Sequence, residues 1–294
     1  MSASQAGILQ PVPKVARHLI FTHSLESDPA EQLRRLQDVA DGDSIVVGLG
    51  QSLLLHVGCD VKGMQDMPAL SGSSVEIPST PASLWIWLRG EDRGDLVVQT
   101  LALKQRLAGA FELRDAVDCF MHQDSRDLTG YEDGTENPQG EDAERAALVS
   151  SGIEGLDGSS FASIQQWLHN LSHFQALPQT EQDNIFGRHR DTNEEFDSAP
   201  ESAHVKRSAQ ESFSPEAFML RRSMPWNNES QEGLVFLSFG HSLAAFDAIM
   251  RRMVGLEDGI TDGLFRFTRP VNGAYFWCPP MKDGKLNLSL LKIS

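Results

Sequence analysis

Short apolar runs alternate with helix-like segments along the first half of the chain. Runs such as LWIWL and SIVVG are continuous and short, which is typical of buried strands. Asp28, followed by Pro29 and by Glu31, is a helix-start signal with the spacing of a capping box. We predict strands at residues 18–22, 44–48, 84–88 and 111–120, and helices at 28–41 and 92–108.

The second half repeats this order of elements. Leu243, Phe246, Met250 and Met253 fall on one face of a helix that would cover a sheet. We predict strands at residues 160–168, 217–222, 234–239 and 274–277, and a further helix at 178–186. Two β-α-β-β-α-β units predict the α+β class, as a pair of ferredoxin-like modules with mainly antiparallel sheets. The two sheets could face each other as a sandwich or as a barrel-like core.

The pattern also predicts how the chain is divided. We expect an N-terminal module over residues 1–125, a loop and linker over 126–157, and a C-terminal module over 158–294. The second module is interrupted at 188–215 by a polar insert without periodicity. An insert of that length in a compact domain usually carries function.

Composition narrows the class of protein. With 294 residues, 40% hydrophobic and 22% charged, the chain is typical of a globular protein. The formal charge of −16 argues against nucleic acid and anionic membranes as partners. The three cysteines form no C-x-x-C pair, and we find neither a secretory signal nor an apolar run of membrane-spanning length. We therefore expect a cytoplasmic protein.

The loop GYEDGTENP, residues 130–138, is the most informative segment. Gly130 and Gly134 allow positive φ and a close approach to the main chain, and Pro138 prevents ladder pairing. Such a loop can hold the central carboxylate of Asp133 against a bound group. A solvated acidic turn is the alternative, and the loop by itself does not exclude it.

Two further groups carry chemistry. Met219, Arg221 and Ser223 would share one face of a strand, while Arg222 would lie on the other. One arginine must then point where apolar side chains usually lie, either in a structural ion pair or toward an anion. His204 lies late in the polar insert, and as a lone histidine it could equally be a surface residue. Basic residues bracket the insert and favour an anionic ligand: Arg188, His189, Arg190, Lys206 and Arg207.

Taken in order, these segments resemble the dye-decolourising peroxidase family, and specifically its class B. The loop GYEDGTENP is similar to the G-x-x-D-G loop of that family. Supporting phrases are QWLHNL at 166–171, FGR at 186–188, AHV at 203–205, LRRSMP at 220–225 and GAYFW at 273–277. The resemblance extends from His18 to about Pro280.

The resemblance implies one haem b per chain, in the C-terminal module. By position, Asp133 matches the distal aspartate, Arg221 the distal arginine and His204 the proximal ligand of the iron. Ser223 stands where some relatives carry Asn, which puts the third distal group in doubt. Arg188 and Arg207 are our candidates for contacts with the haem propionates. Asp262 or Asp258 would accept the hydrogen bond of His204.

The implied activity is that of a haem peroxidase. Hydrogen peroxide would be the oxidant, and organic donors such as dyes and phenols would be oxidised by one-electron steps through a ferryl and porphyrin-radical intermediate. An aspartate base near its ordinary pKa predicts an optimum at about pH 4–5. Aromatic candidates for electron relay to bulky donors are Tyr131, Trp226, Tyr275 and Trp277. The alternative is a haem-handling protein, for carriage or iron release, with incidental peroxidase activity.

Two expectations concern assembly. Relatives imply a homo-oligomer, from dimer to hexamer. The tail at 283–292 also faintly resembles the docking peptides of encapsulated peroxidases, so the chain could be encapsulin cargo.

Overall fold

Each half of the chain forms a four-stranded antiparallel sheet. The computed structural model describes residues 3–72, 75–291 and 293. In the first half, the sheet order is β2-β5-β1-β6. These strands are β1 (Val15–His23), β2 (Ile45–Leu49), β5 (Leu84–Gly90) and β6 (Phe111–Phe120). The four strands predicted for this half are confirmed, with small shifts of their ends.

The second half has the same strand order, β9-β10-β7-β12. Short strands β8 and β11 extend it beside β10 and β7. The bounds are β7 (Ser160–His169), β8 (Leu220–Arg221), β9 (Met224–Asn227), β10 (Glu232–Gly240), β11 (Thr268–Pro270) and β12 (Ala274–Cys278). The repeated order confirms the predicted pair of ferredoxin-like units, whereas the division at residues 125 and 158 stays a prediction.

The two sheets close on each other into one antiparallel barrel. Cys119 of β6 pairs with Trp226 of β9, and Trp277 of β12 pairs with Leu49 of β2. These two narrow seams join the halves into a ring of eight strands, β7-β12-β2-β5-β1-β6-β9-β10. Of the two arrangements left open by the sequence, the barrel-like core is therefore the one formed.

Strand alternation divides the core into an inner and an outer layer. In β5, Trp85 and Trp87 point into the barrel, where both rings lie near Phe239 at centroid distances of 6.2 and 6.1 Å. Leu84, Ile86 and Leu88 point outward under the helices. A continuous apolar run is thus explained by a strand that is covered on both faces.

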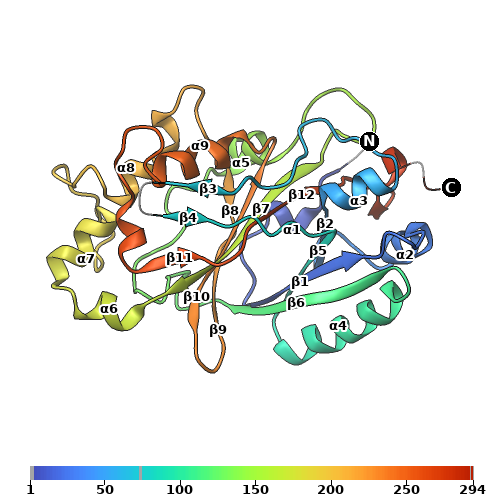
Figure 1. The fold of residues 1–294 in the computed structure, drawn as a ribbon, viewed down its shortest axis with the longest axis horizontal. Coiled ribbons are helices and arrows are strands. Elements are labelled where there is room, and N and C mark those ends of the chain that lie inside the picture. The colour runs from blue at the N-terminus through green and yellow to red at the C-terminus, as the bar shows by residue number, and fades with distance from the viewer. Residues whose placement is uncertain (1–2, 73–74, 292, 294) are drawn as a thin grey trace.

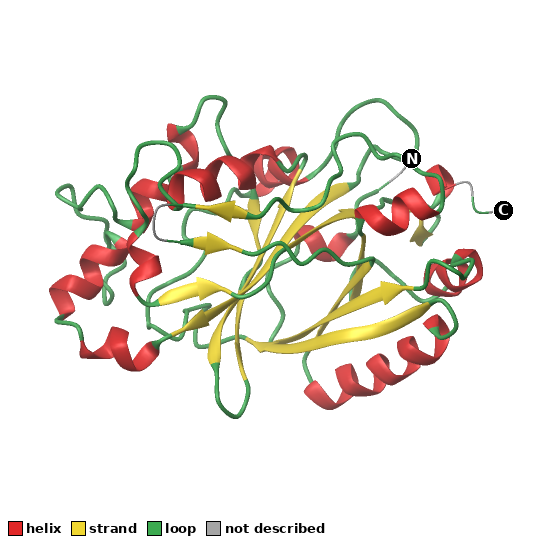
Figure 2. Ribbon diagram, viewed as in Figure 1, coloured by secondary structure: helices red, strands yellow, loops and turns green. Residues whose placement is uncertain are grey.

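Helices cover the outside of the barrel (Figures 1 and 2). Helices α2 and α4 lie against the first half, and α9 packs over the second, as predicted. Short helices α1, α3, α5, α6 and α8 were not predicted. The bounds are α1 (Ala6–Leu9), α2 (Ala30–Gln37), α3 (Gln51–His56), α4 (Arg93–Leu107), α5 (Gly140–Ala147), α6 (Leu171–Ala176), α7 (Gln179–Phe186), α8 (His204–Ser208) and α9 (Ala244–Met253).

The remaining elements are small. Two hairpins, β3 (Leu70–Ser71) with β4 (Glu76–Ile77) and β13 (Met281–Lys282) with β14 (Lys285–Leu286), lie outside the barrel sheet. Three 3₁₀ turns complete the chain: η1 (Gln210–Ser212), η2 (Gly263–Arg266) and η3 (Ser289–Leu291). The polar insert is thus partly ordered, with α8 and η1 inside it.

Candidate functional site

A cavity of about 250 Å³ lies on the outer side of the second sheet. One wall is apolar, with Trp167 of β7, Phe236 of β10, and Met250 and Met253 of α9. The loop at residues 131–136 and α8 also line the cavity. The stripe of Met and Phe on α9, which reads as ordinary core in the sequence, therefore also forms the wall of a binding site.

His204 is the first residue of α8 and lines this cavity. Its Nδ1 lies 2.8 Å from Oδ2 of Asp262, whose side chain is completely buried. The other carboxylate oxygen, Oδ1, accepts a hydrogen bond from the Leu264 amide at 2.8 Å. An ionised carboxylate can only accept, so Nδ1–H of the imidazole donates to Asp262, and Nε2 is left free of this hydrogen bond. Of the two candidates from the sequence, Asp262 is the residue that reaches His204.

Asp133 lies at the tip of the predicted glycine loop and also lines the cavity. Gly130 and Gly134 have φ of +88° and +78°, so both are in the left-handed region, as expected for this loop. The Asp133 side chain is half-buried, and it borders both this cavity and a smaller one beside it. The loop is therefore not a solvated turn: it directs a carboxylate inward.

The charges around Asp133 oppose one another. Burial raises its pKa above the ordinary 3.8, the positive charge of Arg221 lowers it, and the negative charge of Asp127 raises it again. The net direction is upward. The expectation of an unperturbed aspartate is corrected here, because desolvation outweighs the favourable charge.

Arg221 ends β8 and lines the same cavity. Its Nε is buried and has no hydrogen-bond partner among the described residues. Its backbone, in contrast, is held by one side chain: Asn137 accepts from the Arg221 amide at 2.8 Å and donates to the Arg221 carbonyl at 3.0 Å. Asn137 thus ties the glycine loop to β8 and places Asp133 and Arg221 on one cavity.

Ser223 does not line the main cavity. Regular pairing is interrupted between β8 and β9, so the alternation that grouped Ser223 with Arg221 does not hold. The Ser223 hydroxyl instead accepts a hydrogen bond from the Leu237 amide at 3.4 Å. It borders the smaller cavity, of about 10 Å³, together with Asp133. That volume is roughly what one water molecule needs.

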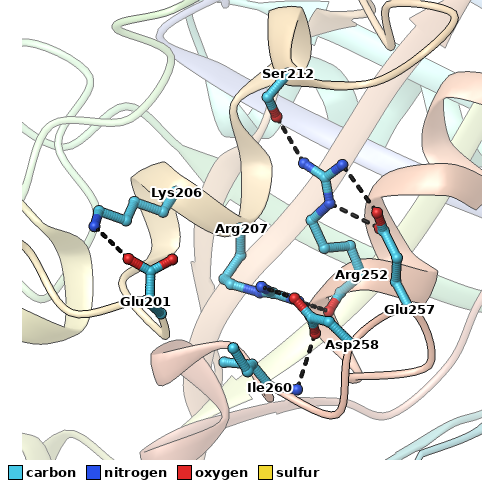
Figure 3. A network of polar contacts seen from close by, with 8 residues as sticks. All are labelled: Glu201, Lys206, Arg207, Ser212, Arg252, Glu257, Asp258 and Ile260. Atoms are coloured by element: carbon cyan, nitrogen blue, oxygen red, sulfur yellow. Dashed lines mark hydrogen bonds and ion pairs between the residues drawn. The ribbon is translucent and has the colours of Figure 1, made fainter.

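The two other arginines have different surroundings. Arg188 lines the cavity, but Nη2 pairs with Glu136 at 2.7 Å and with Glu195 at 3.2 Å. Arg207 is not brought to the cavity. It is buried and forms two hydrogen bonds to Asp258, at 2.7 and 2.8 Å (Figure 3). That pairing corrects our expectation for Arg207 and also explains why Asp258 is not the partner of His204.

Three residues at the site were not found from the sequence. Asn137 is one, and its position in the T-E-N-P tail of the loop was the available signal. Asp127 and His169 are the others: both are buried, both line the cavity, and they lie 3.1 Å apart at Oδ1 and Nε2. Residue spacing gave no signal for this pair, because 42 residues separate its members.

The four aromatic candidates for electron relay differ in their position relative to the cavity. Tyr131 lines the cavity, stacks on Phe186 at a centroid distance of 3.9 Å and donates to Asp183. Trp226 is buried, and its Nε1–H donates to the carbonyl of Trp167, a cavity residue, at 3.0 Å. Tyr275 and Trp277 are buried and are not part of the cavity lining. Electron relay through any of them stays a prediction.

The described part of the chain contains no helix with both the length and the apolar character that crossing a bilayer requires.

Comparison with known proteins was made for both sequence and structure. Residues 124–283 match the model of the family described as "Dyp-type peroxidase, C-terminal". A dye-decolorizing peroxidase from Rhodococcus erythropolis is 28% identical, over 98% of this chain and 96% of that protein. Another from Mycolicibacterium paratuberculosis is 30% identical, over 71% of this chain and 61% of that protein.

Solved structures agree with these matches. A dye-decolorizing protein from V. cholerae superimposes with a TM-score of 0.86 and 26% identity, covering 99% of each chain. A variant of DypB from Rhodococcus jostii RHA1, in complex with heme, gives a TM-score of 0.85 and 25% identity, covering 97% of each chain. The similarity therefore extends over both modules.

Proposed function

This chain belongs to the Dyp-type peroxidase family of haem-dependent enzymes, and we propose that the cavity between β10 and α9 is its haem and peroxide site. The observation that supports this most directly is that His204, Asp133 and Arg221 all line that one cavity. They come from three separate segments, which the sequence alone does not bring together.

The side chains present fit a haem. His204 offers Nε2 of a neutral imidazole, the ring nitrogen that remains after Nδ1–H has donated to Asp262. The apolar wall would accept a porphyrin face. The buried Nε of Arg221 has no partner among the described residues, as expected for a group that serves a ligand. When bound, haem supplies the redox chemistry that cleaves the peroxide O–O bond and takes electrons from donors.

On the proximal side, Asp262 fixes the tautomer and the ring orientation of His204. A buried acceptor on Nδ1–H makes the imidazole more basic at Nε2. His204 is therefore the residue that would hold the haem iron, through Nε2. Arg188, at the rim, could contact a propionate only by exchanging Glu136 or Glu195 for it.

On the distal side, Asp133 would accept a proton from bound hydrogen peroxide and return it to the departing oxygen. Its pKa is raised by burial, so it needs a higher pH to ionise than a free aspartate does. The permanent charge of Arg221 would stabilise the negative charge that develops on the outer oxygen. Ser223 would act through a water molecule in the smaller cavity that it shares with Asp133.

Finer assignments belong to the same proposal. We infer class B, because the G-x-x-D-G phrase with its T-E-N-P tail and the other family phrases fit that compact branch. Organic donors would be oxidised by single-electron steps, the protein would work in the cytoplasm, and it would form a homo-oligomer. We do not propose that the chain is encapsulin cargo, because three leucines of the tail are buried in the chain's own core: Leu286, Leu288 and Leu291.

A haem-handling protein is the less favoured alternative. Carrying haem requires a ligand to the iron and an apolar pocket. It does not require a half-buried carboxylate with a raised pKa, or an arginine whose buried Nε has no partner among the described residues. Both groups cost folding free energy where they are. Their presence at the cavity supports peroxide chemistry.

The test is stopped-flow absorbance of the haem-loaded protein mixed with hydrogen peroxide. We expect a fast change of the Soret band, slowed about 10²–10³-fold in Arg221→Ala and about 10²–10⁴-fold in Asp133→Asn. His204→Ala should lose normal haem binding, whereas His173→Gln, an exposed histidine on α6, should behave as wild type. Wild-type protein that binds haem but reacts slowly with peroxide would instead favour haem handling.

A further inference from the structure

Asp127 and His169 form a buried polar pair that the mechanism above does not use. Asp127 lies at the start of the glycine loop and His169 is the last residue of β7. Oδ1 of Asp127 is 3.1 Å from Nε2 of His169, and Oδ2 accepts from the amide and the hydroxyl of Thr129 at 2.9 and 2.6 Å. Both side chains are nearly inaccessible to solvent.

The hydrogen bonds around His169 suit a ring that carries both protons. Nδ1 is 2.6 Å from Oγ1 of Thr268, and that hydroxyl donates its own proton to the carbonyl of Leu168 at 3.1 Å. The hydroxyl must then accept from Nδ1–H. A neutral ring would leave a lone pair on Nε2 facing the Asp127 carboxylate, which is unfavourable. All these contacts are satisfied when His169 carries both ring protons and Asp127 is ionised.

The behaviour of Asp127 agrees with this arrangement. Burial alone would raise its pKa, but the hydrogen bond and charge of His169, together with the bonds from Thr129, lower it on balance. Asp127 is therefore a carboxylate that stays ionised inside the protein.

This pair is linked to Asp133 in two ways. The Asp127 amide donates to the Tyr131 carbonyl at 2.9 Å, and the Gly130 amide donates to the Asp127 carbonyl at 2.9 Å, so Asp127 closes the turn that leads to Asp133. Its charge also acts on Asp133 directly. The titratable groups that act on Asp133 are Arg221 from β8, His204 from α8 and Asp127 from the preceding turn.

We propose that Asp127 and His169 are a positioning pair for the peroxide reaction. The imidazolium of His169 keeps Asp127 ionised and anchors the loop to β7, and the ionised Asp127 makes Asp133 a stronger base than Arg221 alone would allow. Neither residue contacts the reacting atoms in this role. The inference rests on the proposed role of Asp133 and adds the group that tunes it.

The Asp127→Asn variant distinguishes the role of Asp127 in anchoring the loop from the effect of its negative charge. An Asn can still accept from Thr129 and donate to Nε2 of a neutral His169, so the loop keeps its hydrogen bonds while the carboxylate charge is lost. The rate of the Soret change with peroxide would be measured against pH for the haem-loaded wild type, Asp127→Asn and Asp124→Asn. Asp124 is an exposed carboxylate three residues earlier, and its variant is the matched control.

We expect the acid limb of the Asp127→Asn profile to move to lower pH, with the limb of Asp124→Asn unchanged. His169→Leu should slow the reaction about 10²-fold, because the loop loses its anchor. A second readout does not depend on activity: ¹⁵N NMR of the histidine rings in the haem-free full chain should show His169 doubly protonated at pH 7 in wild type and neutral in Asp127→Asn.

Two results would overturn the proposal. One is a pH profile of Asp127→Asn that superimposes on wild type, and the other is a neutral His169 in the wild-type NMR spectrum. A slow reaction in all Asp133 and Arg221 variants together with an unshifted Asp127→Asn profile would keep the proposed function and remove this inference alone.

Discussion

At the scale of single residues, ionisation of Asp133 destabilises the folded protein. Its pKa is raised, so the folded protein disfavours the ionised form. A carboxyl group whose pKa is raised on folding favours the folded state at pH values below its pKa in the unfolded chain. This stabilisation is lost as the pH rises through its pKa in the folded protein. We therefore expect haem-free Asp133→Asn to be more stable than wild type at pH 7, by about 1 kcal/mol.

The measurement is urea unfolding at pH 7 and again near pH 3.5. The stability gained by Asp133→Asn should shrink toward the lower pH, where wild-type Asp133 is mostly protonated in both the folded and the unfolded state. Asp124→Asn, which removes an exposed carboxylate from the same segment, should show no such pattern. Equal stability of Asp133→Asn and wild type at both pH values would contradict the assigned penalty.

Asp262 supports a second prediction at this scale. Asp262→Asn keeps the size of the side chain but weakens the acceptor for Nδ1–H of His204, so Nε2 becomes a poorer donor to iron. We expect haem affinity to fall about 10–100-fold, measured by titration of the haem-free chain. Glu201→Gln, on the exposed partner of Lys206, is the control. An unchanged affinity would mean that Asp262 does not tune His204.

The position of a site residue could be predicted from the sequence where a local motif fixes the backbone. The glycines around Asp133 impose the loop, and the structure places its carboxylate in the cavity as expected. Side-chain direction could not be read in the same way. Arg207 and Arg188 have similar basic surroundings in sequence, yet only Arg188 lines the cavity, because the partner of Arg207 is supplied by Asp258, 51 residues away.

At the scale of elements, periodic segments were predictable and short ones were not. Helix α4 has 15 residues and a side-chain cap at Asp92, and its bounds lie within one residue of the prediction. Helix α8 has 5 residues, no side-chain cap and a polar sequence, so no periodicity marks it. Its position depends on tertiary contacts, above all on the two bonds from Arg207 to Asp258.

That dependence gives the element-scale prediction. Arg207 also donates to the Arg252 carbonyl at 2.7 Å, so it joins α8 to the end of α9 (Figure 3). Arg207→Met should destabilise the haem-free chain by about 1–3 kcal/mol. Lys206→Met, at the neighbouring and more exposed pair with Glu201, should cost much less.

The pH dependence of that loss follows from Asp258. The pKa of Asp258 is lowered to about 2, first by its hydrogen bonds from Arg207 and next by the hydrogen bond from the Ile260 amide. Because the pKa of Asp258 is lower in the folded protein, its ionised form stabilises the fold at pH values above the ordinary pKa of 3.8. This stabilisation is lost as the pH falls through about 2. The difference between wild type and Arg207→Met should therefore narrow between pH 4 and pH 2, as chemical unfolding at several pH values would show. A constant difference would indicate that packing alone, without the ion pair, anchors α8.

At the scale of the whole molecule, the two modules were visible in the sequence but their closure was not. Repeated strand and helix patterns are local, and they predicted the two β-α-β-β-α-β units. The barrel is closed by pairings such as Cys119 with Trp226 and Trp277 with Leu49, which join strands far apart in the chain. Local patterning carries no information on such register, so a sandwich could not be excluded.

The chain ends give the last prediction. Gln5 is fully buried, donates to the carbonyls of Val47 and Pro279, and so fastens the N-terminal segment to the segment before β13. Leu288 and Leu291 then pack into the main core. The tail is thus part of the chain's own hydrophobic core, whereas a docking peptide would need these leucines exposed to a shell protein.

Leu288→Ala distinguishes the two roles. Removing a buried leucine side chain should lower the free energy of unfolding by about 2–4 kcal/mol, measured by urea denaturation of the haem-free chain. Leu25→Ala is the control, since that leucine is 76% exposed and should cost less than about 1 kcal/mol. A Leu288→Ala variant as stable as wild type, yet unable to enter a co-expressed encapsulin shell, would restore the cargo hypothesis that the burial of this tail argues against.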